Sequence, residues 1–321
     1  LKLLHLSISS ILYVLSFSPF DYKVFIFFSL AFLFHSLENL SIKNKIKAVI
    51  YFSLLYHLLG TSWINYSLIN YGSLGHLLSY IITFLFALII SLPYILIGLY
   101  KSTSSNNYFY LCYIASLFVL AEYLKSILYG GFSWLLIGHS QNGTIFDFVY
   151  PLLGSFAVSY LVVLTSLFFY KAFNDRNKIS LFFSSALLAV YFLNPILHNN
   201  ENTRDLDMVS YTLYQPNIYP QQSYDSAQYS LIMKKYNTII NMNKTSDLVI
   251  FPETILPIPF SREDEFFKSF QTTTNDTNML ITGLFSKSDD KFFNSMIFFS
   301  DNINIYNKRK LVPFGEYTPW Y

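Results

Sequence analysis

Cysteine and charged residues are scarce in this sequence. A single cysteine, Cys112, in 321 residues excludes an intrachain disulfide. Lys, Arg, Asp and Glu make up 12% of the chain, about half the roughly 25% usual in soluble domains, which argues against an ordinary soluble globule. The sequence contains no Gly-rich phosphate loop, metal-spaced Cys/His cluster or internal repeat, so we expect no cofactor or metal. The net charge of +2 gives no indication of a nucleic-acid partner.

Hydrophobic residues make up 53% of the chain, and the charges are distributed unevenly. Residues 1–200 contain ten Lys/Arg and five Asp/Glu, whereas residues 201–321 contain eleven and fourteen. All six histidines lie in the first part, so no Ser-His-Asp triad can form within the second. This division predicts a transmembrane domain over 1–200 and a water-soluble domain over 201–321.

A membrane-spanning helix needs about 20 mostly apolar residues. Seven apolar runs meet or approach this length, at 3–18, 22–38, 46–64, 76–99, 108–128, 148–170 and 179–197. We therefore expect an α-helical polytopic membrane bundle of about seven spans. Pro93 lies inside the fourth run and should kink it.

Lys and Arg in the connecting loops predict the orientation. The even-numbered loops carry seven such residues, Lys43, Lys45, Lys47, Lys101, Lys171, Arg176 and Lys178. The odd-numbered loops carry Lys23 and Lys125. This bias puts the N-terminus in the cytoplasm. Seven spans then predict a multi-pass protein of the bacterial inner membrane, with its soluble domain in the periplasm.

The soluble part reads as alternating α and β structure. The pattern predicts a helix over 226–243, where apolar residues recur at helical spacing, and strands at 208–215, 247–252, 279–285, 295–300 and 303–306. Ser261 is the expected N-cap of a second helix, with Glu263, Asp264 and Glu265 in its first turn.

Three charged residues of the soluble part are candidates for catalysis. Glu253 follows the buried strand pattern LVIFP, where it either acts as a general base or simply ends the strand. Lys308 either stabilises an oxyanion or belongs to a solvated basic cluster. Glu316 is either a second acid or the ion-pair partner of a nearby lysine.

Other candidate residues lie in the membrane part. Cys112 is embedded in an apolar run, so we expect it to be inert rather than catalytic. Glu122 is a carboxylate in an apolar run and should face the bundle interior. Trp134 follows a Gly- and aromatic-rich stretch, which indicates either a lipid-contacting surface or an interfacial aromatic belt.

Short motifs in order along the whole chain carry a family resemblance. They are residues 17–21 (FSPFD), 60–64 (GTSWI), 122–141, 215–218 (QPNI), 251–254 (FPET) and 306–319. This order resembles the apolipoprotein N-acyltransferase family, polytopic bacterial enzymes that carry a nitrilase-like (carbon-nitrogen hydrolase) domain. Residues 201–321 then correspond to the N-terminal part of that domain, an incomplete α/β nitrilase-like (α-β-β-α sandwich) fold.

The resemblance implies a reaction. An acyl chain passes from a phospholipid, through a cysteine thioester, to the N-terminal amine of a diacylglyceryl-cysteine apolipoprotein. Glu253 matches the general base, Lys308 the lysine that stabilises the oxyanion, and Glu316 a further acidic residue. Tyr224 stands where many members have tryptophan. The substrate-binding residues that the resemblance implies are Tyr224, Phe314, Gly315 and Trp134.

The nucleophilic cysteine of the family is absent from residues 201–321. In the family it follows the block matched by 306–319, together with the second half of the sandwich and a last membrane helix. We therefore expect a fragment that is inactive alone. The alternative is a non-catalytic membrane protein that binds lipid or lipoprotein, or a degenerate paralogue. A transporter is a weaker choice, because few charged residues lie in the apolar runs.

A reporter enzyme fused near residue 205 tests the expected topology. Seven spans deliver this residue to the periplasm, so alkaline phosphatase at this position should be active and β-galactosidase inactive. The opposite pair of activities would contradict the seven-span count.

Overall fold

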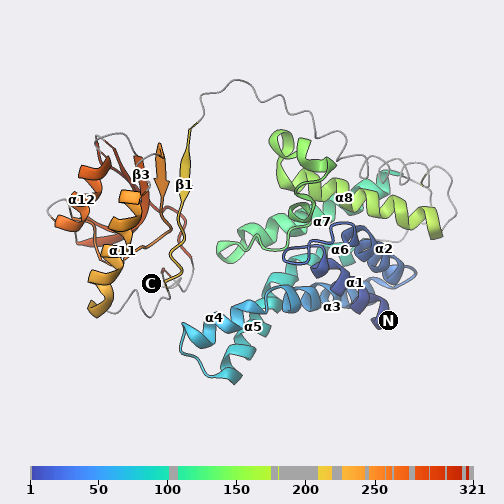
Figure 1. Ribbon diagram of the computed structural model, residues 1–321. Helices are drawn as coiled ribbons and strands as arrows, with labels where there is room; N and C mark the ends of the chain where they lie inside the picture. The colour runs from blue at the N-terminus through green and yellow to red at the C-terminus, as the bar shows by residue number, and fades with distance from the viewer. Residues whose placement is uncertain are drawn as a thin grey trace. The chain divides into compact units, whose positions relative to one another are not determined.

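The structure is a computed structural model that describes residues 2–100, 108–174, 180, 209–218, 226–242, 246–256, 258–261, 264–274, 279–288, 290–300, 302–312 and 316–317. The chain divides into two compact units, Leu1–Glu201 and Asn202–Tyr321 (Figure 1). We call them the helical unit and the α/β unit, and each is described by itself.

The helical unit consists of α-helices linked by short turns and 3-10 helices. In chain order these are α1 (Leu3–Leu15), α2 (Phe25–Leu37), α3 (Ile42–Gly60), α4 (Trp63–Asn70), α5 (His76–Ser91), η1 (Leu92–Tyr94), α6 (Ile95–Gly98), α7 (Tyr108–Ile127), η2 (Leu128–Gly130), η3 (Ile137–Gln141), η4 (Ile145–Phe148) and α8 (Tyr150–Asn174). Pro93 of the fourth apolar run lies in the 3-10 turn between α5 and α6. Gly154, with φ 75°, kinks α8.

Three helical stretches are long and apolar enough to cross a membrane: His76–Gly98, Phe109–Ile127 and Tyr150–Asn174. Helices α1 and α2 are apolar but have only 13 residues each, or about 20 Å against a hydrocarbon core of roughly 30 Å. The seventh predicted run, 179–197, lies outside the described residues apart from position 180.

The three lysines expected in the second loop lie in a helix instead. Helix α3 begins at Ile42, so Lys43, Lys45 and Lys47 lie in its first two turns. Lys45 is buried, and its Nζ donates to the carbonyl oxygen of Tyr100 at 3.1 Å. The same ammonium lies 3.7 Å from the centre of the Tyr100 ring, a contact that a count of charges along the sequence does not reveal.

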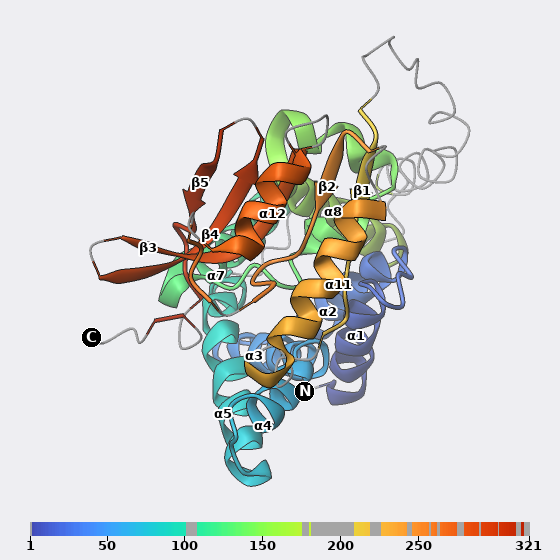
Figure 2. The same cartoon turned by 60° about the vertical axis from the view of Figure 1, so that its left-hand side comes forward.

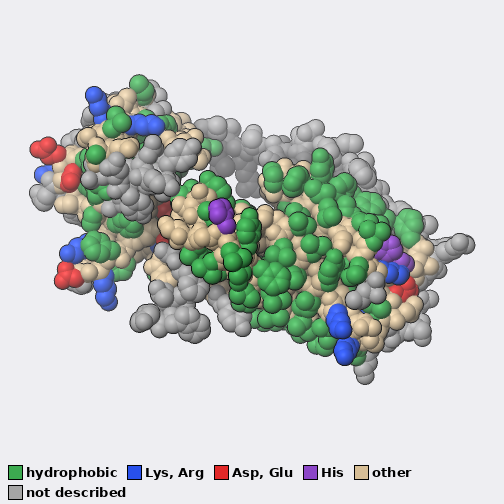
Figure 3. Space-filling model, turned by 90° about the horizontal axis from the view of Figure 1, so that it is seen from below, with side chains coloured by type: hydrophobic (Ala, Val, Ile, Leu, Met, Phe, Trp, Pro, Cys, Tyr) green, Lys and Arg blue, Asp and Glu red, His purple; other side chains and the backbone are tan. Residues whose placement is uncertain are grey.

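Apolar side chains cover the surface of the helical unit as well as filling its interior. Figure 3 shows hydrophobic side chains over most of the visible face of this unit. Many large ones are exposed, including Leu77, Phe84, Phe109 and Leu152. A soluble monomer rarely exposes so much contiguous apolar surface, so this surface is typical of a membrane protein.

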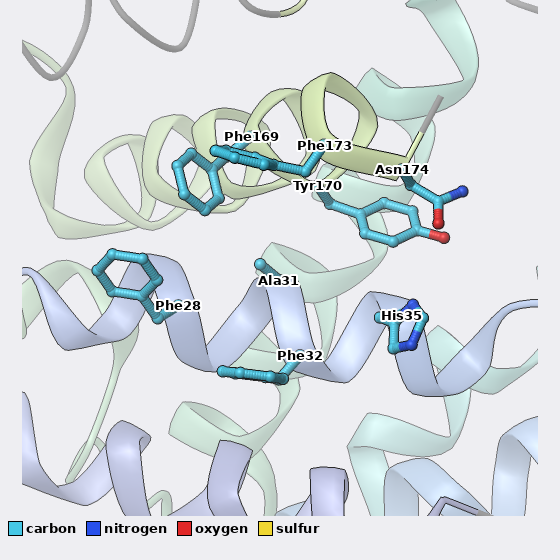
Figure 4. A pocket seen from close by; sticks show the side chains of 8 residues that line it. All are labelled: Phe28, Ala31, Phe32, His35, Phe169, Tyr170, Phe173 and Asn174. Carbon is cyan, nitrogen blue, oxygen red and sulfur yellow. The ribbon is translucent and has the colours of Figure 1, made fainter. Parts of the chain in front are cut away.

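An open groove of about 290 Å³ lies on the helical unit. Figure 4 shows Phe28 of α2 facing Phe169 of α8 across it, and these two rings meet edge-on with 5.4 Å between their centres. It contains none of the catalytic or substrate-binding residues predicted from the sequence. The aromatic lining indicates a surface for apolar contacts rather than for chemistry.

The α/β unit is built on one five-stranded mixed sheet. Its strands are β1 (Tyr211–Leu213), β2 (Leu248–Ile250), β3 (Met279–Ser288), β4 (Lys291–Phe299) and β5 (Asn304–Asn307), in the order β1-β2-β3-β4-β5. The first three strands are parallel, whereas β4 and β5 are antiparallel to their neighbours. The predicted strands are present, but β3 and β4 form a longer hairpin than the sequence indicated.

Two helices cover one face of this sheet (Figure 2). They are α11 (Tyr229–Met242), preceded by the 3-10 turn η6 (Ser226–Gln228), and α12 (Glu265–Thr274). Tyr236 of α11 packs edge-on against Phe251 at 4.8 Å, and Phe270 of α12 packs against Phe299 at 5.7 Å. Of the apolar stripe predicted for 226–243, Ile232, Tyr236, Ile239 and Ile240 face this core. Leu231, which we expected on the same stripe, is exposed instead.

The start of α12 differs from the prediction. The helix begins at Glu265, and Asp264 rather than Ser261 caps it, because Oδ1 of Asp264 accepts from the backbone N–H of Phe266 at 2.8 Å. Ser and Asp are equally good N-cap types, so the sequence alone does not choose between them.

The other face of the sheet, here called the outer face, carries no helix among the described residues. Side chains at alternate strand positions point to it, including Leu213, Ile281, Asn294, Met296 and Tyr306. Leu213, Met296 and Tyr306 are exposed. Predicted site residues also lie on this face.

The aromatic core under α12 should dominate the stability of the α/β unit. Phe270 is fully buried, so Phe270→Ala should lower its free energy of unfolding by about 3–5 kcal/mol. Urea-dependent proteolysis of the intact protein in detergent measures this loss. The control Phe292→Ala removes an exposed ring from β4 and should change it by less than about 0.5 kcal/mol; equal losses would contradict the assigned core.

Candidate functional site

Four side chains meet at the outer face of the sheet. They are Glu253, Asn294, Lys308 and Glu316, which we call the ion cluster. Nζ of Lys308 donates to Oε1 of Glu253 at 3.0 Å and to Oε1 of Glu316 at 2.9 Å. The amide of Asn294 donates to the same two oxygens, at 2.8 Å for Glu316. The structure thus brings together all three predicted catalytic residues.

Glu253 is held by a close approach between two backbones. It follows β2, and the residues around it continue along β3: the N–H of Gly283 donates to Pro252 at 3.1 Å, and the N–H of Ile255 donates to Gly283 at 3.0 Å. A Cβ on Gly283 would lie 2.4 Å from Cα of Glu253. Only glycine permits this approach, so Gly283 fixes the distance between Glu253 and β4.

The other members come from three further segments. Asn294 lies in the middle of β4, and the backbone N–H of Lys308 donates to its carbonyl oxygen at 2.8 Å, which extends the β4–β5 pairing by one residue. Glu316 is anchored by a turn, because its Oε2 accepts from the N–H of Val312 at 2.7 Å. Backbone hydrogen bonds therefore position each charged group.

Hydrogen bonds within the ion cluster set its charge state. The bond to Glu316 raises the pKa of Lys308; burial opposes this shift, and the bond to Glu253 adds to it. Burial alone would raise the pKa of Glu316, but hydrogen bonds from Lys308, Val312 and Asn294 bring it below its usual value. A raised lysine pKa and a lowered carboxyl pKa both favour the charged forms, so both groups are ionised at neutral pH.

The arrangement suits proton transfer next to a fixed cation. Glu253 is the most accessible member, with 59% of its side chain exposed against 31% for Lys308 and 22% for Glu316. A carboxylate in this position can accept a proton, while the ammonium beside it can stabilise negative charge that develops on a substrate oxygen.

The remaining predicted residues lie in the helical unit or outside the described residues. Trp134 lies in the helical unit, where its side chain is exposed. Tyr224, Phe314 and Gly315 lie outside the described residues. Cys112 is a half-buried free thiol in α7. In the part of the chain that the structure describes, no group of three His, Cys, Asp or Glu side chains is placed to hold a metal ion.

Asn294 is the member that sequence reasoning missed. A signal was available, because Asn is depleted in strands and this one interrupts the otherwise aromatic and aliphatic pattern KFFNSMIFF. Its partners come from segments 41 and 22 residues away, so only the fold reveals what the amide contacts.

An apolar helical unit joined to an α/β unit with a carboxylate–ammonium cluster is typical of a membrane protein with an enzymatic domain. Comparison with known families agrees with this class. Residues 9–168 match the family described as "Apolipoprotein N-acyltransferase N-terminal domain". The chain belongs to the apolipoprotein N-acyltransferase family.

Curated relatives support this assignment over nearly the whole chain. The apolipoprotein N-acyltransferase of Aquifex aeolicus is 30% identical over 98% of this chain and 69% of its own length. Those of Haemophilus ducreyi and Haemophilus influenzae are 28% and 27% identical over 95% and 97% of this chain. The chain spans 63% of the length of each Haemophilus relative. The resemblance noted in the sequence is thereby confirmed at the level of the family.

Proposed function

We propose that this protein belongs to the machinery that N-acylates lipoproteins. In the proposed reaction, an acyl chain passes from a phospholipid to a cysteine thiol and then to the N-terminal amine of a diacylglyceryl-cysteine apolipoprotein. The observation that carries the proposal is the ion cluster, in which the predicted base Glu253 and the predicted oxyanion-binding Lys308 lie 3.0 Å apart.

The first half-reaction forms the thioester. Glu253 takes the thiol proton, the sulfur attacks the ester carbonyl of the phospholipid, and the oxyanion that forms accepts a hydrogen bond from Lys308. The C–O bond then breaks, and the proton held by Glu253 passes to the leaving alkoxide of the lysophospholipid. Glu316 holds the ammonium in place throughout.

The second half-reaction transfers the acyl chain to nitrogen. The apolipoprotein amine attacks the thioester carbonyl, the C–N bond forms and the C–S bond breaks. Glu253 accepts the proton that the amine loses and returns it to the thiolate. Residues 202–321 contain no cysteine, and we assign no catalytic role to Cys112. The family resemblance implies a thiol that follows the block matched by 306–319.

The membrane arrangement belongs to the same proposal. We propose seven spans in the bacterial inner membrane and a nitrilase-like sandwich domain in the periplasm. The apolar surface of the helical unit supports membrane insertion, and the mixed sheet with helices on one face supports half of such a sandwich. Both lipid substrates would then reach the site by lateral diffusion. Tyr224, Trp134, Phe314 and Gly315 are proposed substrate contacts.

Substitutions in the ion cluster test the assigned roles. The variants are made in the full gene that encodes this sequence and are assayed in membranes that contain its product. Glu253→Gln should lower acyl transfer by about 10²–10⁴-fold, the usual contribution of a general base. Lys308→Met should lower it by about 10²–10³-fold, as expected for an oxyanion donor. Transfer of a labelled acyl chain to a lipoprotein acceptor measures both.

Lys310→Met is the matched control for these substitutions. Lys310 is exposed, lies two residues from Lys308 and has no contact with the ion cluster among the described residues. Its substitution should leave transfer unchanged at equal protein levels. Normal acyl transfer by Glu253→Gln or by Lys308→Met would contradict the role proposed for that residue.

The polypeptide of residues 1–321 should not form an acyl-enzyme by itself. Incubated with a fluorescent phospholipid and run on a denaturing gel, it should stay unlabelled, whereas the Haemophilus ducreyi relative under the same conditions should be labelled. Label that disappears in Cys112→Ser would instead identify Cys112 as the nucleophile. If the gene product also fails to transfer acyl chains, the absence of a cysteine from residues 201–321 favours a non-catalytic membrane protein that binds lipid or lipoprotein, or a degenerate paralogue.

A further inference from the structure

The segment that links η2 to α8 takes an unusual path through the helical unit. Residues 132–141, here called the interior segment, are not α-helical, yet Leu135, Leu136 and Ile137 are buried. Trp134 is 51% exposed immediately before them. Leu135 has φ 56°, a left-handed conformation that is unfavourable for a leucine. The surrounding structure must therefore hold this segment in place.

Side chains from three helices hold consecutive backbone groups of the interior segment. Trp134 O accepts from Nζ of Lys125 at 2.8 Å, Leu135 O accepts from the hydroxyl of Tyr13 at 3.0 Å, Ile137 N donates to Oε1 of Glu122 at 2.6 Å, and Gly138 N donates to Oγ of Ser159 at 2.8 Å. Non-helical backbone inside an apolar bundle needs such partners, because water is not available to supply them.

Two of these partners are ionisable residues of α7. Glu122 and Lys125 are 0% and 2% exposed, three residues apart and therefore on one face of the helix. Nζ of Lys125 also lies 3.5 Å from Nε2 of His57 in α3, and Nδ1 of His57 lies 2.9 Å from Oγ of Ser91. Burying both charged groups is costly, which argues for a specific task beyond filling space.

Two exposed tryptophans lie next to this hydrogen-bonded network. The ring of Trp134 meets the ring of Trp63, at the start of α4, edge-on with 5.6 Å between their centres. Both side chains are about half exposed. Phe132 likewise packs edge-on against Phe86 of α5 at 5.0 Å. Paired indole rings offer a rigid apolar surface with polar N–H edges, which suits contact with lipid at a membrane interface.

We propose that Glu122 and Lys125 are positioning residues that clamp the backbone on either side of Leu135 and Leu136, so that Trp134 is fixed against Trp63 as a contact surface for lipid acyl chains. The choice of lipid as ligand rests on the proposed function, whereas the clamp itself does not. Both residues bond to the backbone around Trp134, so we call them positioning residues and assign them no part in the chemistry.

Depth-dependent quenching of Trp134 fluorescence tests the clamp in the intact chain. Of the three tryptophans in the sequence, Trp63→Phe keeps an aromatic partner and Trp320→Phe removes the third, which leaves Trp134 as the only tryptophan. Excitation at a wavelength that tyrosine does not absorb then isolates its emission. The protein is placed in phospholipid nanodiscs whose acyl chains are brominated at shallow or deep positions. A clamped Trp134 should be quenched strongly by one lipid and weakly by the other.

Lys125→Met removes the hydrogen bond to Trp134 O at similar side-chain volume, so it should abolish the preference for one bromine depth. Lys125→Arg keeps a donor and should restore the preference. Glu122→Gln keeps the acceptor for Ile137 N and should preserve it. The matched control is Lys45→Met, which also removes a buried lysine bonded to a backbone carbonyl in this unit, and it should leave the preference intact.

Three outcomes would overturn the proposal. An unchanged depth preference in Lys125→Met would show that Trp134 does not need the clamp. An equal loss in Lys45→Met would show that any buried lysine acts through general loosening of the bundle. If Lys125→Met does not fold, Tyr13→Phe removes the hydrogen bond to Leu135 O and should weaken the preference; an unchanged value then rejects the clamp. The quenching ratio does not depend on acyl transfer, so failure of the proposed reaction would be seen separately.

Discussion

A backbone carbonyl or amide that is buried away from water must find another partner, and this requirement shapes the helical unit. Within an α-helix the chain supplies its own partners, but the interior segment leaves that pattern where it crosses the apolar core. Lys125 and Glu122 reach from α7 to Trp134 O and Ile137 N, and Tyr13 reaches from α1 to Leu135 O. These bonds connect helices that are distant in sequence.

The polar groups of the ion cluster in the α/β unit also find partners within the protein, although they lie near the surface. Lys308 shares its ammonium between two carboxylate oxygens, and the amide of Asn294 donates to the same pair. Each member of the ion cluster comes from a different segment, and Gly283 permits the close approach of Glu253 to the sheet. Small shifts of the backbone would therefore separate the charges, which is why a rigid sheet suits this site.

Periodicity and composition predicted much of this protein, and contacts between distant segments account for what they missed. The apolar stripe in 226–243 predicts α11 because its side chains share one local helix face. Asn294 is informative only through contacts with residues far along the chain. Lys45 looks like a loop residue because its partner, the carbonyl oxygen of Tyr100, is 55 residues away. Glu253, Lys308 and Glu316 are candidates for catalysis chiefly by resemblance to a family, since each residue alone fits a structural role equally well.

In the proposed reaction Glu253 acts as a base although it is hydrogen-bonded to the ammonium of Lys308, and the geometry of the ion cluster suggests how. Lys308 and Asn294 both donate to Oε1 of Glu253. In the proposed reaction, negative charge develops on the substrate oxygen as the thiol loses its proton. Lys308 can then shift its hydrogen bond from Glu253 to that oxyanion, while Glu316 and its anchor at Val312 keep the ammonium in place. This shift would release Glu253 from the ammonium at the step where it receives the proton. A second carboxylate is therefore needed to hold the lysine while the first one changes its charge.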